Sequence, residues 1–233
     1  NNINTQALVY PLLSTRRFLR STGINLKVFD SATKSSLVEC DVLGLDSKYF
    51  KEHITNDKLS TLKLIENLRN QVPHTIWFNT SDGTGIIQRE VLDVVSLYLK
   101  GQLLRDRDLY QEPLYGGRVY TNYFNKSFNI EDGMPISSEV LSSSQIAKLR
   151  ISWNLGLAPT FSYARNLARA ILLQGNCLEH LHLIDPIPRT LPTVEPIADN
   201  QLRICARMNL NHPRETIRYH RHLTHNALQK ISV

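Results

Sequence analysis

The sequence predicts an α/β fold, in which a Rossmann-like parallel sheet is flanked by helices. Short apolar runs rich in β-branched and aromatic residues, which suit buried strands, alternate with longer stretches of helical periodicity. The alternation recurs roughly every 20 to 30 residues, as in βαβ units wound around a parallel sheet. The clearest of these units spans residues 74–98.

That unit combines a strand, a polar loop and a helix. Residues 74–79 (HTIWFN) have strand composition, and residues 80–85 (TSDGTG) predict a turn whose two glycines are free to adopt positive φ. A helix is predicted next, because apolar residues recur at helical spacing: Ile87, Val91, Val94, Val95 and Tyr98. Open α/β sheets bind ligands beyond the carboxyl ends of their strands, and a helix start favours anions, so this loop is the first candidate site.

Two elements are predicted at the beginning of the chain. Residues 4–22 predict a helix that begins near Pro11, since proline is tolerated in a first turn, and that stops at Gly23. Residues 24–29 alternate between apolar and polar side chains, which indicates a strand.

Two more elements precede residue 74. Residues 41–45 (DVLGL) predict a short buried strand, followed by a turn or cap at Asp46 and Ser47. Residues 48–70 are predicted to be mostly helical, with apolar residues every three positions at Leu59, Leu62, Ile65 and Leu68.

The pattern changes after Lys100. Residues 103–133 are rich in charge and tyrosine and predict a connection that is part loop and part short helix, and the serine-rich residues 137–144 are predicted to be exposed. A further helical face covers residues 161–172 and ends near Gly175.

The last part of the chain contains a proline-rich stretch, a strand and a helix. Four prolines within residues 185–196 predict an extended crossing, residues 202–208 predict a strand, and Pro213 is expected to open a final helix that reaches about Ile231. We therefore predict one Rossmann-like domain over residues 1–183, a proline-rich crossing at 184–200, and the last strand and exit helix of the same domain at 201–233. Because such domains usually begin with β, we expect a strand before residue 1.

Composition narrows the class of protein but not its partner. The chain has 233 residues, of which 42% are hydrophobic and 21% charged, as in ordinary globular proteins. No apolar run approaches the roughly 20 residues of a membrane span, and no signal peptide is recognisable at residue 1. Three scattered cysteines predict a reducing, cytoplasmic location. The net charge of +6 suits a nucleotide, an acidic glycan, a nucleic acid or a lipid headgroup, without choosing among them.

Several short motifs resemble those of one family. IWFNTSDGTG, LLRDRDLY, LYGGRVYTNYF and WNLGL, in this order, resemble bacterial glycosyltransferase-like proteins from surface-polysaccharide gene clusters. DVLGLDSKYF upstream and ETIRYHRHLTHNAL at the end extend the resemblance over residues 42–228. The resemblance implies a GT-B architecture of two Rossmann-like domains, the first handling the acceptor and the second binding the nucleotide-sugar donor. This chain ends where the donor domain would begin, so we expect it to be the acceptor-side domain.

The resemblance also implies the chemistry and the partners. A sugar would move from a nucleotide-sugar donor to a surface glycan or a lipid-linked acceptor, with no cofactor beyond the nucleotide-sugar co-substrate and with peripheral contact at the inner membrane face. No nucleic acid is expected. In metal-independent transfer, a general base takes the proton of the acceptor hydroxyl, and cationic groups stabilise the departing diphosphate.

Asp82 is the candidate catalytic base, because it follows a central strand on the glycine-bearing loop. The alternative is that its carboxylate only shapes the loop, as an Asx-turn or a helix cap. The neighbouring loop residues are candidate substrate contacts, since glycine lets a ligand approach the backbone: Ser81, Gly83, Thr84 and Gly85.

Two further groups are candidate substrate contacts. Arg105 and Arg107 alternate with aspartates, which indicates either an anion-binding rim or a self-paired, solvated surface. The second group could line a sugar site, because aromatic faces stack on sugar rings and glycines admit close contact: Tyr115, Gly116, Gly117 and Arg118, with Tyr120 and Tyr123 beside them. Its alternative is a packed tyrosine-rich loop. Trp153 is interpreted as core packing at a strand end.

The carboxyl-terminal region also carries histidines and arginines. His220, His222 and His225 lack a cysteine or carboxylate at ligand spacing, so no metal site is predicted, and His180 and His182 are expected to be partly buried on a strand. Arg214, Arg218 and Arg221 form a basic stripe on the last helix, which is either a solvated face or a surface for an anionic membrane.

Two other functions remain open from the sequence. A non-catalytic α/β module could bind an anionic glycan or nucleotide through the same loop. A basic nucleic-acid-binding protein would need clustered Lys and Arg with exposed aromatics, and here the charge is dispersed, so that hypothesis ranks last.

Overall fold

The computed structural model describes residues 3–29, 31–153 and 208–231. Four features predicted from the sequence lie wholly or mostly outside these residues: the helix at 161–172, the pair His180 and His182, the proline-rich crossing at 184–200, and the strand at 202–208. The chain divides into two compact units, which are described separately. The described residues of the first unit are 3–81, 90–101 and 149–153, apart from residue 30, and those of the second are 82–89, 102–148 and 208–231.

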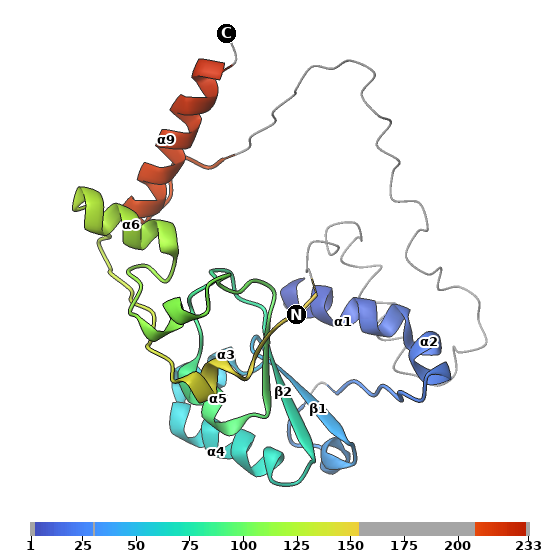
Figure 1. The fold of residues 1–233 in the computed structure, drawn as a ribbon. Coiled ribbons are helices and arrows are strands. Elements are labelled where there is room, and N and C mark those ends of the chain that lie inside the picture. The colour runs from blue at the N-terminus through green and yellow to red at the C-terminus, as the bar shows by residue number, and fades with distance from the viewer. Residues whose placement is uncertain (1–2, 30, 154–207, 232–233) are drawn as a thin grey trace, which may run out of the picture. The chain divides into compact units, whose positions relative to one another are not determined.

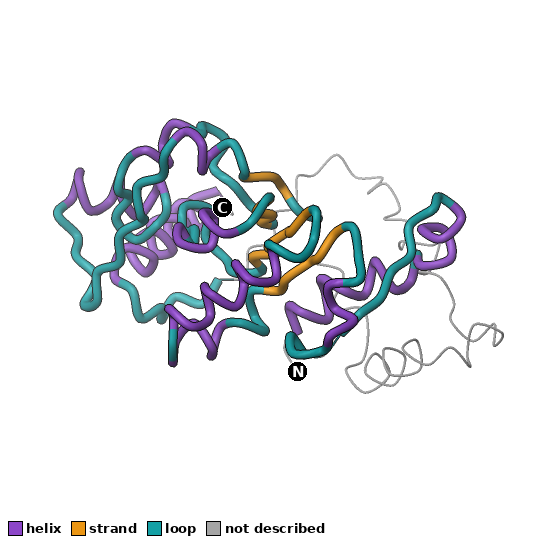
Figure 2. The backbone as a smooth tube through the Cα atoms, turned by 90° about the horizontal axis from the view of Figure 1, so that it is seen from below, coloured by secondary structure: helices purple, strands orange, loops and turns teal. Residues whose placement is uncertain are grey.

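The first unit is built on a four-stranded, all-parallel sheet flanked by helices, which confirms the predicted α/β, Rossmann-like fold. The strands are β1 (Val42–Asp46), β2 (His74–Asn79), β3 (Leu97–Lys100) and β4 (Leu149–Ile151), and they pair in chain order. They are drawn in orange in Figure 2. In the two central strands, β2 and β3, alternate residues are buried.

One row of side chains forms the centre of this core. Leu45, Trp77, Tyr98 and Leu149 are paired from strand to strand by the register, and each is almost completely buried. Trp77 packs against Phe50, with ring centroids 5.6 Å apart, just before α3 (Lys51–Asn56). Burying side chains of this size contributes a few kcal/mol each, about 1.5–3 for a leucine or phenylalanine.

The opposite face of the sheet packs against the amino-terminal helix. Side chains alternate along a strand, so Phe78 points away from Trp77. The Phe78 ring lies 5.4 Å from that of Trp153, whose Nε1 donates a hydrogen bond to the Leu8 carbonyl in α1 (Ile3–Ser14). Gly44 leaves room for Phe78, since a Cβ there would lie 3.1 Å from the ring. Trp153 is thus half-buried packing beyond β4, as predicted. Figure 1 shows α1 and α4 (Lys58–Arg69) on either side of β1 and β2.

The amino-terminal predictions were partly wrong. The helix begins at Ile3 and contains Pro11, rather than beginning there, and the chain continues into α2 (Arg16–Ser21) after Thr15. The stop at Gly23 is confirmed: its φ is +86°, its N–H donates to Arg20, and the Ile24 N–H donates to Leu19, as in a Schellman motif. No strand forms at 24–29, because Ile24 is exposed and the alternating pattern has no core to face.

The predicted helix at 48–70 is two helices, α3 and α4. Asp57 separates them, and its carboxylate accepts a hydrogen bond from the Ser60 N–H as the N-cap of α4. The buried face of α4 consists of Thr61, Ile65 and Leu68, whereas Leu59 is 65% exposed, so the three-residue spacing identified only part of the face.

The connections on either side of β1 are short. The predicted turn at Asp46 is confirmed, since its carboxylate accepts a hydrogen bond from the Lys48 N–H at 3.1 Å. A short 3-10 helix, η1 (Ser35–Val38), precedes β1 and buries Leu37.

The helix predicted over residues 87–98 was wrong. Only α5 (Arg89–Val94) is helical, and the chain then enters β3. The residues chosen as the apolar face are mostly buried, but β-branched Val95 and the alternation of Leu97 to Lys100 favour a strand paired with β2. Ser96, just before β3, is joined to Thr75 of β2 by two hydrogen bonds: each residue's N–H donates to the other's hydroxyl.

The second unit contains the remaining elements. These are η2 (Asp108–Gln111), α6 (Val119–Phe128), α7 (Ser143–Ile146) and α9 (Glu215–Ile231). Phe124 and Phe128 of α6 pack against Tyr219 of α9, with centroids 5.3 and 5.7 Å apart. The final helix ends as predicted, but Arg214 supplies the first helical carbonyl, so Pro213 precedes the N-cap instead of occupying the first turn.

The serine-rich segment is not uniformly exposed. Ser138 is buried, and its hydroxyl accepts a hydrogen bond from the Leu114 N–H at 2.7 Å. Ser142 forms a capping box with Gln145 at the start of α7. Serine composition predicted solvent exposure, whereas two of these hydroxyls satisfy backbone donors instead.

Candidate functional site

The glycine loop of residues 82–85 is fixed by backbone contacts within the second unit. Gly83 has φ +88°, as predicted, but Gly85 does not lie in the left-handed region. Gly85 is needed for a different reason: its N–H donates to the Gly117 carbonyl at 3.1 Å, and a Cβ would lie 2.8 Å from that oxygen. The Thr84 carbonyl accepts a hydrogen bond from the buried Tyr110 hydroxyl at 2.7 Å. Burial raises the pKa of Tyr110.

The loop does not open a helix. The next helix, α5, begins at Arg89, four residues after Gly85, and is six residues long. The predicted attraction of an anion by a helix start at this loop is therefore wrong, because no helix begins there and the Gly85 N–H already donates to the Gly117 carbonyl.

The turn of residues 115–118 meets this loop. Gly116 and Gly117 have φ of +68° and +65°, and their N–H groups donate to Ile136 and Leu114. A Cβ on Gly116 would lie 2.6 Å from Thr121 Oγ1, and one on Gly117 would overlap Ile86. Both glycines are thus required by the left-handed backbone and by the close packing.

Side chains, rather than the glycines, form the accessible part of the loop and the turn. All four glycines are buried, so they shape the backbone and pack it closely, and Tyr115 and Thr84 are half-buried. The Tyr115 hydroxyl accepts a hydrogen bond from the Asp132 N–H, which leaves the ring as the part of this residue that could meet a ligand.

Arg118 joins the loop to the turn. It is the N-cap residue of α6, and its Nη1 donates to the Tyr120 hydroxyl at 3.2 Å, with Cζ 5.9 Å from the Tyr120 ring centroid. A Cβ at Gly83 would lie 3.6 Å from Arg118 Nε, so the guanidinium group lies against the glycine loop. Two motifs that are well separated in the sequence are therefore in contact.

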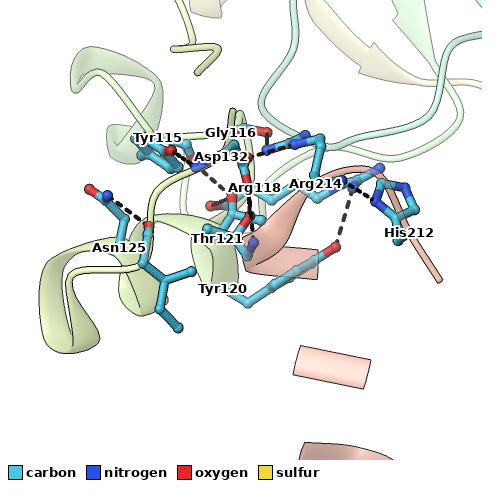
Figure 3. Close-up of polar contacts among 11 residues, drawn as sticks. Tyr115, Gly116, Arg118, Tyr120, Thr121, Asn125, Asp132, His212 and Arg214 are labelled. Atoms are coloured by element: carbon cyan, nitrogen blue, oxygen red, sulfur yellow. Dashed lines mark hydrogen bonds and ion pairs between the residues drawn. The ribbon is translucent and has the colours of Figure 1, made fainter. Parts of the chain in front are cut away.

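A buried carboxylate holds the start of α9 against this turn. Asp132 Oδ2 forms an ion pair with Arg214 Nε at 2.8 Å, and Asp132 Oδ1 accepts hydrogen bonds from the Thr216 N–H and hydroxyl at 2.9 Å. Arg214 Nη2 donates to the Gly116 carbonyl at 3.1 Å. Figure 3 shows Arg214 between Asp132 and Gly116. Burial alone would raise the pKa of Asp132, but the hydrogen bonds from Thr216 and Arg214 outweigh it, and the pKa is lowered.

Arg214 is consequently not part of a free basic face. The predicted stripe of Arg214, Arg218 and Arg221 is only partly available, because Arg214 is paired with Asp132 and Arg218 is paired with Glu215. The link from this stripe to the glycine turn was not predicted. The helical spacing of the three arginines indicates a shared face but not a partner.

Asp82 is exposed, and it makes no hydrogen bond or ion pair with the residues that the structure describes. The interpretation as a helix cap is wrong, since α5 begins seven residues later at Arg89 and the Asp82 carboxylate accepts no backbone N–H among those residues. Asp82 directly precedes Gly83, and therefore lies in the loop that Arg118 contacts.

Arg105 and Arg107 are placed differently. Arg105 is exposed, Arg107 is half-buried, and neither forms an ion pair with Asp106 or Asp108 within the described part of the chain. Asp106 instead accepts a hydrogen bond from the Asp108 N–H at 3.0 Å. The self-paired surface is not observed there, and no hydrogen bond between described residues joins either arginine to residues 82–85.

Ser81 belongs to the first unit, where a buried lysine holds it. Lys100, at the end of β3, is completely buried, and its Nζ donates to the Ser81 carbonyl at 2.8 Å and the Ser81 hydroxyl at 3.0 Å. The Ser81 hydroxyl donates to Asn79 Oδ1 at 2.5 Å. Ser81 thus fixes the residues that follow β2. Lys100 was not predicted from the sequence, where its signal is only a lysine that ends an apolar strand.

Comparisons with protein-family models, curated proteins and solved structures found no match to this chain. Within residues 3–29, 31–153 and 208–231, no group of three or more His, Cys, Asp or Glu side chains could hold a metal ion. Over those same stretches, no helix is both long enough and apolar enough to cross a bilayer.

Proposed function

We propose that this chain is the acceptor-side domain of a bacterial glycosyltransferase, which moves a sugar from a nucleotide-sugar donor to a surface glycan or a lipid-linked acceptor. The proposal rests on the motifs that resemble this family and on one geometric observation. The glycine loop and the Tyr115–Arg118 turn are joined by the hydrogen bond from the Gly85 N–H to the Gly117 carbonyl, so two separate candidate motifs lie at one place. The reaction would take place in the cytoplasm, at the inner membrane face.

The residues of the site have distinct roles in this proposal. The acceptor hydroxyl attacks the anomeric carbon, the bond from that carbon to the diphosphate oxygen breaks, and the nucleoside diphosphate leaves with the bonding electrons. Asp82 takes the proton of the hydroxyl, because its exposed carboxylate lies on the glycine loop that Arg118 contacts. Arg118 contacts the anionic part of the substrate, and the half-buried Thr84 and Tyr115 side chains meet the sugar.

The test is transfer by the protein expressed from its complete gene, with a panel of nucleotide-sugars and polyprenyl-linked acceptors. We expect Asp82→Asn to lower kcat about 100-fold or more, because general-base catalysis contributes that much. Glu131→Gln is the matched control: Glu131 is an exposed carboxylate of the same unit with no described partner, and its amide should leave the rate unchanged. A folded Asp82→Asn protein with the original rate would remove the catalytic assignment.

One observation favours a second candidate, a non-catalytic module that binds an anionic glycan or nucleotide. No described residue orients the Asp82 carboxylate, whereas catalytic bases are usually positioned by neighbours. This candidate predicts that the complete protein binds a nucleotide or acidic oligosaccharide with Arg118-dependent affinity and catalyses no transfer from any donor in the panel.

A further inference from the structure

Arginines at the start of α6 and in the amino-terminal half of α9 differ in how they are neutralised. Arg214 and Arg218 are paired with carboxylates. Arg118 and Arg221 have no carboxylate partner in the described part of the chain. The Arg118 guanidinium donates to the Tyr120 hydroxyl, and the Arg221 guanidinium donates to the Asn209 carbonyl, both of which are neutral oxygens. The guanidinium groups of Arg118 and Arg221 therefore have no internal counter-ion among the described residues.

Contacts link Arg118 to α9, the helix that carries Arg221. The Arg118 guanidinium lies over Tyr120, and the Tyr120 ring stacks on His220 with centroids 4.7 Å apart. His220 immediately precedes Arg221 in α9. Arg221 Nη1 donates to the Asn209 carbonyl at 2.5 Å, three residues before His212.

His212 completes the group. Its Nδ1 accepts a hydrogen bond from the Arg214 N–H at 3.1 Å, which leaves Nε2 as the donor of the neutral imidazole. Figure 3 shows Arg118, Tyr120, His212 and Arg214 together at the start of α9. Desolvation lowers the pKa of His212, and the charges of Arg221, Arg214 and Arg118 lower it further, so all three cations act on this imidazole. Arg214 is neutralised by Asp132, whereas Arg118 and Arg221 have no carboxylate partner among the described residues, and their charge attracts an anion.

We propose that Arg118, His212 and Arg221 form a binding site for a phosphoryl group, which we call the phosphoryl site. Two guanidinium forks and one imidazole N–H supply more donors than the two oxygens of a carboxylate can use. A phosphoryl group presents three acceptor oxygens and up to two negative charges, and arginine suits it geometrically. The stacked Tyr120 and His220 rings offer an adjacent surface for a base or a sugar ring.

This inference rests on the proposed function for one point only, namely which molecule carries the phosphoryl group. Both a nucleotide-sugar and a lipid-linked acceptor carry a diphosphate, so the same residues can recognise either. The neighbouring glycine loop and Asp82 would then lie beside the sugar that the diphosphate carries.

The experiment is a calorimetric titration of the chain with three probes: inorganic diphosphate, uridine diphosphate and farnesyl diphosphate. We expect saturable binding of at least one, weakened about tenfold or more by Arg118→Gln and by Arg221→Gln, since each removes a charge-assisted hydrogen bond. Lys126→Gln and Lys230→Gln are the matched controls. Each removes one positive charge from the same helix, about 12 Å or more from the arginine along its axis, and should leave the affinity within about twofold.

A second readout does not depend on affinity. The imidazole signals of His212 in nuclear magnetic resonance spectra, identified by their absence in His212→Gln, should shift during the titration and stop shifting at saturation. If Arg118→Gln fails to fold, this signal and the Arg221→Gln titration still test the site.

The outcomes separate the site from the proposed function. Preference for uridine diphosphate would indicate the donor, and preference for farnesyl diphosphate would indicate a lipid-linked acceptor; both support the site. Diphosphate binding that neither arginine variant weakens, or no binding of any probe with a stationary His212 signal, would overturn it. A complete protein that transfers no sugar but binds diphosphate through these residues would contradict the proposed enzyme and leave the phosphoryl site intact.

Discussion

Gly117 links backbone conformation to the candidate site. Its φ of +65° is unfavourable for a residue with a Cβ, and its carbonyl accepts the hydrogen bond that holds Gly85. A side chain would also overlap Ile86. The position of the glycine loop therefore depends on the absence of a single methyl group.

We expect Gly117→Ala to lower the free energy of unfolding by about 2 kcal/mol, through backbone strain and the clash with Ile86. Gly133→Ala is the control, since Gly133 belongs to the same unit, does not have positive φ, and would place an added Cβ more than 4 Å from any other side chain or backbone segment. Urea unfolding followed by far-UV circular dichroism measures both. Equal stability of the two variants would show that the turn relaxes without cost.

Asp132 gives the second unit a pH-dependent stability. Its pKa is lowered on folding, although burial opposes this, because Thr216 and Arg214 stabilise the carboxylate. Such a group stabilises the folded state above its unfolded pKa, about 3.9, and the contribution is lost as the pH falls through the folded pKa.

We therefore expect the free energy of unfolding to decrease from about pH 4 downward, and Asp132→Asn to reduce that slope. At neutral pH the variant should be less stable by about 3 kcal/mol, because Arg214 loses its buried partner. Urea titrations across this pH range, with exposed Asp106→Asn as the control, measure both effects. An unchanged slope in Asp132→Asn would exclude Asp132 as the titrating group.

Among the elements, α4 depends on a capping residue. Asp57 ends α3 and accepts the Ser60 N–H at the start of α4, and this hydrogen bond is the first cause of the lowered pKa of its carboxyl group. Ile65 and Leu68 of the helix that follows this cap are buried. A single residue thus separates two helices that periodicity alone merges into one.

Asp57→Ala should lower the melting temperature by a few degrees, because an unpaired N–H at the start of α4 loses its acceptor. Asp57→Asn keeps an acceptor at the same position and should retain most of the stability. Thermal unfolding of the three proteins, monitored by circular dichroism, tests this. If the alanine and asparagine variants melt together below the parent, charge rather than capping is responsible.

Across the whole chain, the described residues form two compact units with separate cores. Trp77 and Tyr98 lie in the first, and the α6–α9 pair fixed by Asp132 lies in the second. The phosphoryl site and the glycine loop both belong to the second unit. Substitutions at these residues therefore change no residue of the sheet in the first unit.

We expect Asp132→Asn to accelerate amide hydrogen exchange in α6 and α9 by at least about tenfold and to leave the amides of β2 and β3 unchanged, since compact units open separately. Exchange followed by mass spectrometry measures both groups in one sample. The same acceleration in the strands would mean that the two units unfold as one.

Local sequence was sufficient for the α/β class, for β1 and β2 within a residue of their ends, and for the stop at Gly23. These depend on composition and on backbone preferences that act over a few residues. The glycine loop and the Tyr115–Arg118 turn were also recognisable, but only as separate candidates. Helix and strand could not be separated at residues 95–100, because the same buried positions satisfy either period until pairing with β2 selects one.

Tertiary contacts alone brought the loop and the turn together, placed buried Lys100 against Ser81, and tied Arg214 to Asp132 across more than eighty residues. Such contacts join segments far apart in the chain, and no local pattern encodes which distant group a side chain will meet. The charges of Arg118 and Arg221 became informative for the same reason. Their lack of a described carboxylate partner is a property of the folded unit, whereas the sequence shows only that they are basic.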